Sequence, residues 1–213
     1  MSDRYENDSQ QYGDMFKVTP SRSYHKYWQG YTETQITTPK GKKKIKRTYV
    51  APWKQQDLTD RQWKSVKVIY SLLTLLSVFL TVYALSRRVG SNVCWYVALA
   101  GLPSVILLFL QFSVTILYDI SPRKMTLWEH RSSSNRIRYT SLISGIALSL
   151  TALATLIYTF INQSDQPGAE FLCAVLLLLA AFSMFAIRCM ESRIKYIDIP
   201  NDVSAAEDSY AIR

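Results

Sequence analysis

Four apolar runs dominate the chain: SVKVIYSLLTLLSVFLTVYALS (residues 65–86), NVCWYVALAGLPSVILLFLQFSVTILY (92–118), YTSLISGIALSLTALATLIYTFI (139–161) and AEFLCAVLLLLAAFSMFAI (169–187). The overall 48% hydrophobic content would suit a soluble domain, but the apolar residues are concentrated in these runs. Each run is close to the ~20 apolar residues with which a helix crosses ~30 Å of hydrocarbon. The sequence therefore predicts an all-α integral membrane fold, a four-transmembrane-helix bundle with spans at about 66–86, 93–118, 140–161 and 170–188.

Polar segments flank this predicted membrane domain, which we place at residues 65–190. Residues 1–28 lack periodicity and are expected to form a disordered polar tail. Residues 29–64 are expected to form a basic arm that also carries the start of the first helix, and residues 191–213 a short polar tail. The first 30 residues contain no apolar run typical of a cleavable signal, so the first span is expected to act as its own insertion signal.

Two short segments in the arm favour extended structure. YTETQITT and KKIKRTYV are rich in Thr, Tyr, Ile and Val, and the turn residues Pro39 and Gly41 lie between them. This pattern predicts a β-hairpin within residues 29–50. An isolated hairpin is only marginally stable in water, so it would need a partner surface.

The start of the first helix has a local signal of its own. Thr59 is followed three residues later by Gln62, the spacing of a capping box, in which each side chain satisfies a backbone amide of the other residue. This spacing predicts a helix that begins near Asp60 and runs directly into the first span. A second, short helix is expected within Met125 to His130.

The arm also carries a run of basic side chains, KGKKKIKR, before the first span. One hypothesis is that this run binds anionic lipid headgroups, which attract basic residues by about 1 kcal/mol each near the surface. Alternatives are a solvated charge run that only retains the arm on one side, and a nucleic-acid patch, which we disfavour. The residues concerned are Lys40, Lys42, Lys43, Lys44, Lys46 and Arg47.

The distribution of Lys and Arg around the spans predicts their orientation. Basic residues are frequent in the N-terminal flank, in the 119–139 connection and after the fourth span, whereas the two remaining turns carry only Arg87 and Arg88. Short loops rich in Lys and Arg stay in the cytoplasm. We therefore expect both termini to be cytoplasmic, with the protein in the cell membrane.

Small and hydroxyl residues share one face of the first span and one face of the third. Helices in lipid approach most closely where such residues face each other. We therefore expect the first and third spans to pair at the bundle centre. Gln111, an amide within the second span, is expected to bond to a neighbouring helix. The predicted packing residues are Ser71, Thr74, Thr81, Ser144, Gly145, Ala152 and Thr155.

The sequence carries no recognisable catalytic constellation. Glu129-His130 does not match HExxH, and three scattered cysteines with two histidines do not form a zinc motif. We expect no catalytic activity, no cofactor and no metal. The function favoured by the sequence is a non-catalytic membrane anchor or subunit whose basic arm binds anionic lipid, a protein partner or a second copy of the chain. The alternative is a small channel or transporter, or a membrane subunit of a transport complex, with the hydroxyl stripes lining a polar path.

Overall fold

The computed structural model describes residues 30–37, 43–162 and 166–201, and the chain divides into two compact units, residues 1–49 and 50–213. In the first unit, β1 (Tyr31–Thr37) pairs antiparallel with β2 (Lys43–Tyr49), and Tyr31 lies opposite Tyr49. The rings of these two tyrosines meet edge to face, with centroids 5.1 Å apart. The predicted strand pairing is confirmed, while the Pro39–Gly41 turn lies outside the described residues.

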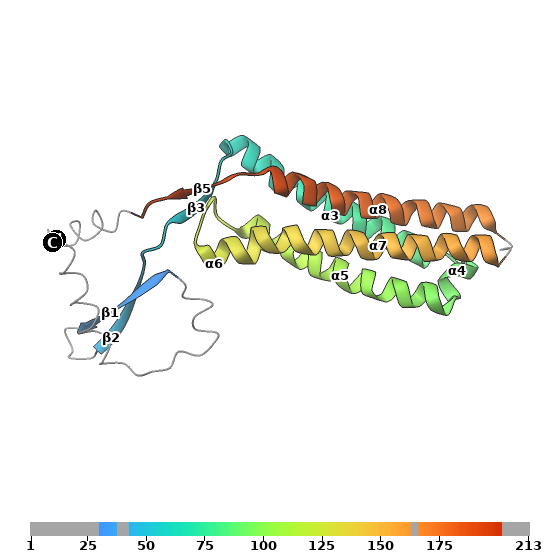
Figure 1. Ribbon diagram of the computed structural model, residues 1–213, viewed down its shortest axis with the longest axis horizontal. Coiled ribbons are helices and arrows are strands. Elements are labelled where there is room, and N and C mark those ends of the chain that lie inside the picture. The colour runs from blue at the N-terminus through green and yellow to red at the C-terminus, as the bar shows by residue number, and fades with distance from the viewer. Residues whose placement is uncertain (1–29, 38–42, 163–165, 202–213) are drawn as a thin grey trace. The chain divides into compact units, whose positions relative to one another are not determined.

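The second unit is built on four long helices that lie side by side (Figure 1): α3 (Asp60–Ser86), α5 (Trp95–Ile120), α7 (Arg136–Ile161) and α8 (Pro167–Arg193). All four are long and apolar enough to cross a membrane. Each predicted span lies almost wholly within one of these helices. Many of their large apolar side chains are exposed, as expected of helices whose outer faces meet lipid rather than water.

The predicted start of the first helix is confirmed. α3 begins at Asp60, and Thr59 is its N-cap. The Gln62 amide donates to Thr59 Oγ1 (3.3 Å), and the Thr59 amide donates to Gln62 Oε1 (3.0 Å), which is the reciprocal bonding of a capping box.

The predicted pairing of the first and third spans is wrong. α3 packs against α8 and α5, and α7 also packs against α8 and α5, whereas α3 and α7 share no comparable contact. The physical reason is that the other two helices also carry small faces, with Gly101 and Ser104 on α5 and Ala174, Ala180 and Ala181 on α8, all buried. Close backbone approach is therefore available to every helix. α8 is the most buried of the four.

Gly145 shows the consequence of this arrangement. A Cβ placed on Gly145 would lie 2.9 Å from the ring of Phe185 on α8. We expect Gly145→Leu to lower the free energy of unfolding by about 1–3 kcal/mol through overpacking. Ala154→Leu, on the same helix but half-buried, is the control and should cost less. Equal losses for the two variants in a denaturant titration would contradict this packing.

Short elements connect the helices at each end of the bundle. At one end, α4 (Gly90–Val93) joins α3 to α5. At the other end, β4 (Lys124–Met125), α6 (Leu127–His130) and a five-residue π-helical segment, η1 (Arg131–Asn135), lead into α7. The predicted short helix is thus α6, and it starts with its own capping box between Thr126 and Glu129.

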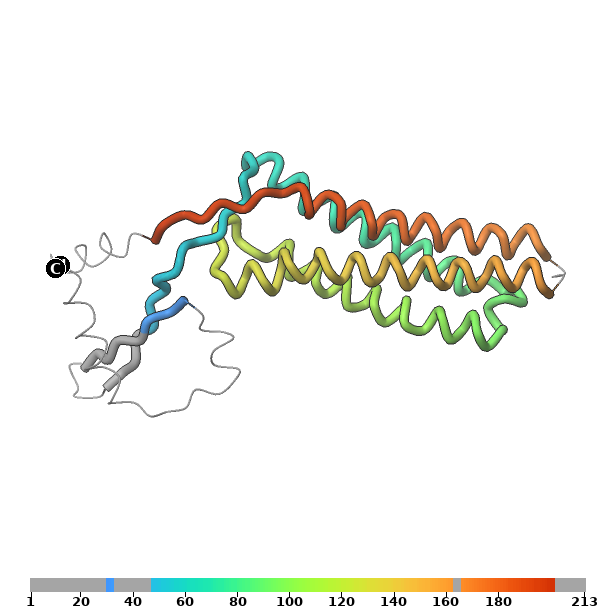
Figure 2. The backbone as a smooth tube through the Cα atoms, viewed as in Figure 1, coloured from blue at the N-terminus to red at the C-terminus, as the bar shows by residue number. Residues whose placement is uncertain are grey.

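A three-stranded sheet, absent from the all-α prediction, lies at this second end, which we call the sheet end (Figure 2). β3 (Trp53–Gln56) is central, with β4 on one side and β5 (Tyr196–Ile199) on the other, both antiparallel. Strands of two to four residues are too short to show period-2 alternation, and β3 and β5 lie far apart in the sequence. The sheet therefore forms only because the helices bring its strands together.

Candidate functional site

Glu191, in the last turns of α8, is a buried carboxylate at the sheet end. Only 3% of its surface is exposed. Oε2 accepts hydrogen bonds from the hydroxyls of Tyr70 (2.9 Å) and Tyr118 (3.3 Å). Oε1 accepts from Tyr196 (2.7 Å) and from Ser134. A carboxylate has about four lone-pair sites, so these four donors saturate it.

Each donor comes from a different element of the fold. Tyr70 lies on the buried face of α3, four residues before the buried Thr74. Tyr118 ends the buried face of α5, three residues after Thr115. Ser134 comes from η1 and Tyr196 from β5. One side chain of α8 therefore joins two other long helices, the segment before α7 and one strand of the sheet.

Gln56 adds the central strand to this arrangement. It is 1% exposed, and its Nε2 donates to the hydroxyls of both Tyr118 and Tyr196, at 2.8 Å each. Gln56 lies opposite Tyr196 in the β3–β5 register. We call Glu191, Tyr70, Tyr118, Ser134, Tyr196 and Gln56 the Glu191 cluster.

Further contacts fix the sheet around the cluster. Lys54 of β3 forms an ion pair with Asp198 of β5. The ring of His130 packs against the ring of Tyr196, with centroids 4.4 Å apart. On the other edge of the sheet, the buried Met125 accepts a hydrogen bond from Ser133 (3.5 Å). The strands are thus held by side chains as well as by their backbone pairing.

Hydroxyl groups, rather than a cation, offset the burial of the carboxylate. Within the described ranges, no salt bridge reaches Glu191, whereas Lys54 and Arg123 form ion pairs with Asp198 and Asp60, respectively. Burial, and then the negative charge of Glu191, raise the pKa of Tyr196, so this phenol keeps its proton and remains a donor. Hydrogen bonds to a charged group contribute about 1.5–3 kcal/mol each, against a desolvation penalty of several kcal/mol. The saturated carboxylate is therefore suited to a structural junction, with no lone pair left for a substrate.

A second buried acid lies at the other end of α8. Glu170 is fully buried, and its Oε2 accepts a hydrogen bond from Thr159 of α7 (3.2 Å). A Cβ on Gly90 would lie 2.5 Å from the Tyr158 hydroxyl oxygen and 3.3 Å from Glu170 Oε1. The close approach of Gly90 to Tyr158, and secondarily to this acid, leaves no room for a side chain at this position.

The residues predicted for helix packing bond mainly to α5, to α8 or within their own helix. Gln111 accepts a hydrogen bond from Thr140 of α7 (2.5 Å), which confirms the expectation of a helix partner for this amide. Ala152 is buried in the core. The recorded contacts of the others are Ser71 with Asp119 (2.5 Å), Thr74 with Thr115 (3.1 Å), Ser144 with the carbonyl of Leu107 (3.2 Å), Gly145 with Phe185, and Thr155 with the carbonyl of Thr151 (3.0 Å).

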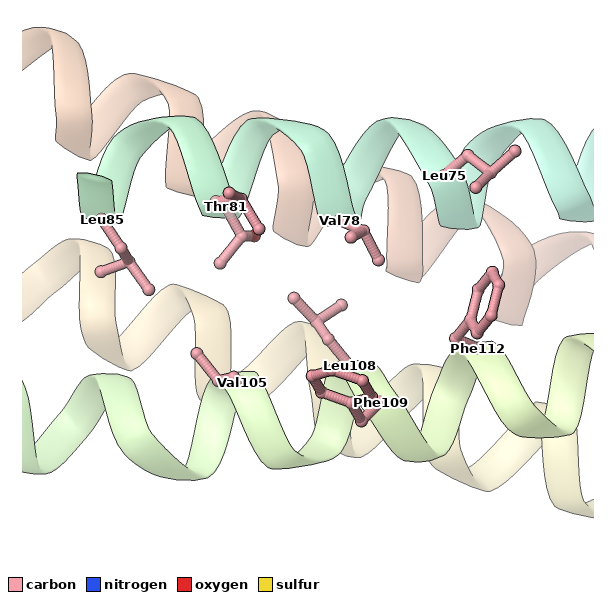
Figure 3. Close-up of a pocket in the computed structure, with 9 residues that line it drawn as sticks. Leu75, Val78, Thr81, Leu85, Val105, Leu108, Phe109 and Phe112 are labelled. Atoms are coloured by element: carbon pink, nitrogen blue, oxygen red, sulfur yellow. The ribbon is translucent and has the colours of Figure 1, made fainter. Parts of the chain in front are cut away.

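Thr81 lines an apolar groove of about 280 Å³ between α3 and α5 (Figure 3). The helices approach each other on either side of it, at Gly101 and Leu85 and at Thr74 and Thr115. The Thr81 hydroxyl has no hydrogen-bond partner within the described part of the chain. The other lining residues are Leu75, Val78, Val82, Leu85, Val105, Leu108, Phe109 and Phe112, so the groove contains no titratable group.

The basic run predicted to contact headgroups falls largely outside what the structure describes. Lys40 and Lys42 lie outside the described residues, and so do the side chains of Lys43, Lys44 and Lys46, although the backbone of the last three belongs to β2. Arg47 is exposed on β2, opposite Glu33 in the β1–β2 register.

The sequence-based predictions did not include the Glu191 cluster. One signal for it was present: Met184, Ile187 and Glu191 recur at the three- and four-residue spacing of one helix face. All three are buried in the structure. Continuing the apolar face of the fourth span beyond residue 188 would have placed Glu191 inside the bundle. The partners of Glu191 carry no local signal.

No group of three or more His, Cys, Asp or Glu side chains in the described ranges is placed to hold a metal ion. The three cysteines, Cys94, Cys173 and Cys189, are free thiols. Comparisons of the chain with known protein families, with curated proteins and with solved structures each found no match.

Proposed function

We propose that this chain is an integral membrane protein of the cell membrane that acts as a non-catalytic anchor or subunit. Its four long helices cross the bilayer, and the sheet end, with both termini, faces the cytoplasm. The observation that carries this proposal is the Glu191 cluster, in which a single carboxylate bonds to residues of α3, α5, η1 and β5. Such a junction holds the three-stranded sheet of β3, β4 and β5, which we call the platform, against the sheet end of the helix bundle.

The hydrogen bonding of the helices favours packing over transport. The hydroxyls of Ser149 and Thr155 each donate to the carbonyl four residues earlier on α7. Hydroxyls bonded in this way need no water and can lie against a neighbouring helix. A small channel or transporter therefore remains the second candidate function, and a measurement of ion or solute flux tests it.

The partners proposed for the anchor are anionic lipids at the cytoplasmic surface and a protein bound to the platform. Basic residues cluster at the sheet end and in the arm, and such segments are attracted to anionic leaflets. Ile197 of β5 is a large apolar residue of the platform that is half exposed (49%), which suits contact with a second protein.

The orientation can be tested with reporter fusions. Alkaline phosphatase fused after Ser133 is expected to be inactive, because η1 would lie in the cytoplasm, where the enzyme stays reduced. The same enzyme fused after Ser164, in the connection between α7 and α8, is expected to be active. Activity at Ser133 would reverse the orientation, and activity at both positions would contradict the four-span arrangement.

The function itself is tested by comparing binding with transport. The full chain, cross-linked in native membranes and purified, is expected to carry a stoichiometric partner that is lost in Ile197→Asp but kept in the matched variant Phe171→Asp, at the opposite end of the bundle. The pure protein in liposomes is expected to give no ion or solute flux above that of protein-free liposomes. Flux above this background, without a retained partner, would favour the transport candidate.

A further inference from the structure

A second hollow, of about 360 Å³, lies where the start of α3 meets the end of α8. Its lining combines apolar and charged residues: Asp57, Leu58, Val66, Met190, Arg193, Ile194 and Lys195. The Asp57 amide donates to the carbonyl of Lys195 (3.0 Å), so the two segments that form the hollow are bonded to each other. The hollow belongs entirely to the second unit of the chain.

The position of this hollow suits a boundary between hydrocarbon and headgroups. Val66 is the first residue of the first predicted span, and Met190 lies just beyond the end of the fourth. Both pack against the hydrophobic core of the bundle and give the hollow an apolar wall. Arg193 and Lys195 lie further along the chain toward the sheet and are exposed. An amphipathic ligand would find both of its environments here.

The charges of the lining favour an anion with one negative charge. Arg193 and Lys195 supply two positive charges and Asp57 one negative charge, which leaves one positive charge to be balanced. No ion pair to Arg193 or Lys195 is recorded in the described part of the chain. The guanidinium of arginine binds phosphate through two parallel hydrogen bonds. A phosphodiester matches this arrangement in both charge and geometry.

We propose that this hollow binds one anionic phospholipid, with its phosphodiester on Arg193 and Lys195 and an acyl chain against Val66 and Met190. Basic pockets between spans at the cytoplasmic surface bind anionic headgroups in this way. The inference rests on the membrane location proposed above and is independent of the basic run in the arm. A docked protein is disfavoured because seven residues line the hollow, whereas standard protein interfaces use about 20–30 residues per side.

The test is a binding measurement on the full chain in detergent micelles, with phosphatidylglycerol as the probe and native mass spectrometry as the readout. The wild-type chain is expected to bind one phosphatidylglycerol in preference to phosphatidylcholine. In the double variant Arg193→Gln with Lys195→Gln, affinity is expected to fall roughly 30-fold, which corresponds to about 1 kcal/mol per basic residue. Each single variant should lose roughly 5-fold by the same conversion.

The matched control is Arg87→Gln with Arg88→Gln, which removes the same charge at the opposite end of the bundle and should leave the affinity within about twofold. Unchanged affinity in the Arg193 and Lys195 variants, or an equal loss in the control, would overturn the site. Displacement of the lipid by equimolar glycerophosphoglycerol, its soluble headgroup, would overturn the assignment to a lipid. Lipid binding in micelles does not depend on the orientation of the chain in a membrane. A negative binding result would therefore leave the result of the phosphatase fusions unchanged, so the lipid site and the proposed orientation can fail separately.

Discussion

Glu191→Ala is expected to lower the free energy of unfolding by about 3 kcal/mol or more, at the upper end of the range for single substitutions, because it breaks a buried hydrogen-bond network. The substitution leaves four hydroxyl donors without their acceptor, and three of them belong to the large side chains Tyr70, Tyr118 and Tyr196. A buried donor left unsatisfied costs about 1–3 kcal/mol. Denaturant titration of the full chain in detergent micelles, followed by circular dichroism, measures the loss.

Two further variants test whether the loss of stability is due to the buried carboxylate of Glu191. Ser192→Ala changes the exposed neighbour of Glu191 on α8 and should cost less than about 0.5 kcal/mol, the range for surface substitutions. Glu191→Gln keeps one acceptor oxygen and should fall between the two. A loss for Glu191→Ala no larger than that for Ser192→Ala would mean that the buried carboxylate contributes nothing to stability.

Truncation of the chain after Lys195 is expected to speed hydrogen exchange at the β3 amides by about 100-fold or more. The truncation removes β5, which pairs with all four residues of β3, together with Asp198 and Tyr196. Net contributions of about 0.5–1.5 kcal/mol for each lost hydrogen bond add up to several kcal/mol of local stability. Each 1.4 kcal/mol corresponds to about tenfold in the opening equilibrium that exchange reports.

The matched control for this truncation ends the chain after Asn201, so that β5 is retained. In this control, the β3 amides should exchange as in the full chain. Amides in the middle of α7 should be unaffected by either truncation, because this helix packs mainly against α8 and α5. Fast exchange of β3 in the full chain, or slow exchange after truncation at Lys195, would show that the strands do not depend on each other.

Features of this fold that rest on local sequence could be predicted. The four helices follow from the length and apolarity of their runs, and the start of α3 follows from Thr59 and Gln62, which are three residues apart. The β1–β2 pairing likewise depends on two segments that are close together in the sequence. In each case the residues that decide the structure are close together in the sequence.

Features that depend on distant residues could not be predicted. Gln56 reaches Tyr196 across 140 positions, and Tyr70 reaches Glu191 across 121. Glu191 continues the helix face of Met184 and Ile187, but its charged segment, MESRIK, favours a solvent-exposed helix end, and nothing local indicates its partners. Only the convergence of the helix ends with β3 and β5 buries this carboxylate. The sheet and the cluster therefore depend on tertiary structure.

The prediction that the first and third spans pair with each other is wrong for a related reason. The prediction rests on the small and hydroxyl residues of the first and third spans, whereas the alanines of α8 and Gly101 of α5 supply small faces of the same kind. Because all four helices carry small faces, their composition does not distinguish one helix pairing from another. The buried polar contacts at the helix ends, such as Tyr70 with Glu191 and Thr159 with Glu170, favour α8 as the common neighbour of α3 and α7.

The central claim is that the carboxylate of Glu191 couples the sheet to the helices, and a double-mutant cycle between Glu191→Ala and Tyr196→Phe tests it most directly. Unfolding free energies of the wild-type chain, the two single variants and the double variant give the interaction energy. The Tyr196 hydroxyl donates to Glu191 Oε1 at 2.7 Å, so we expect a coupling of about 1–3 kcal/mol, within the range for residues in one network. The same cycle with Tyr139→Phe, at an exposed tyrosine, should give additive losses. Additivity within about 0.5 kcal/mol between Glu191 and Tyr196 would contradict the account.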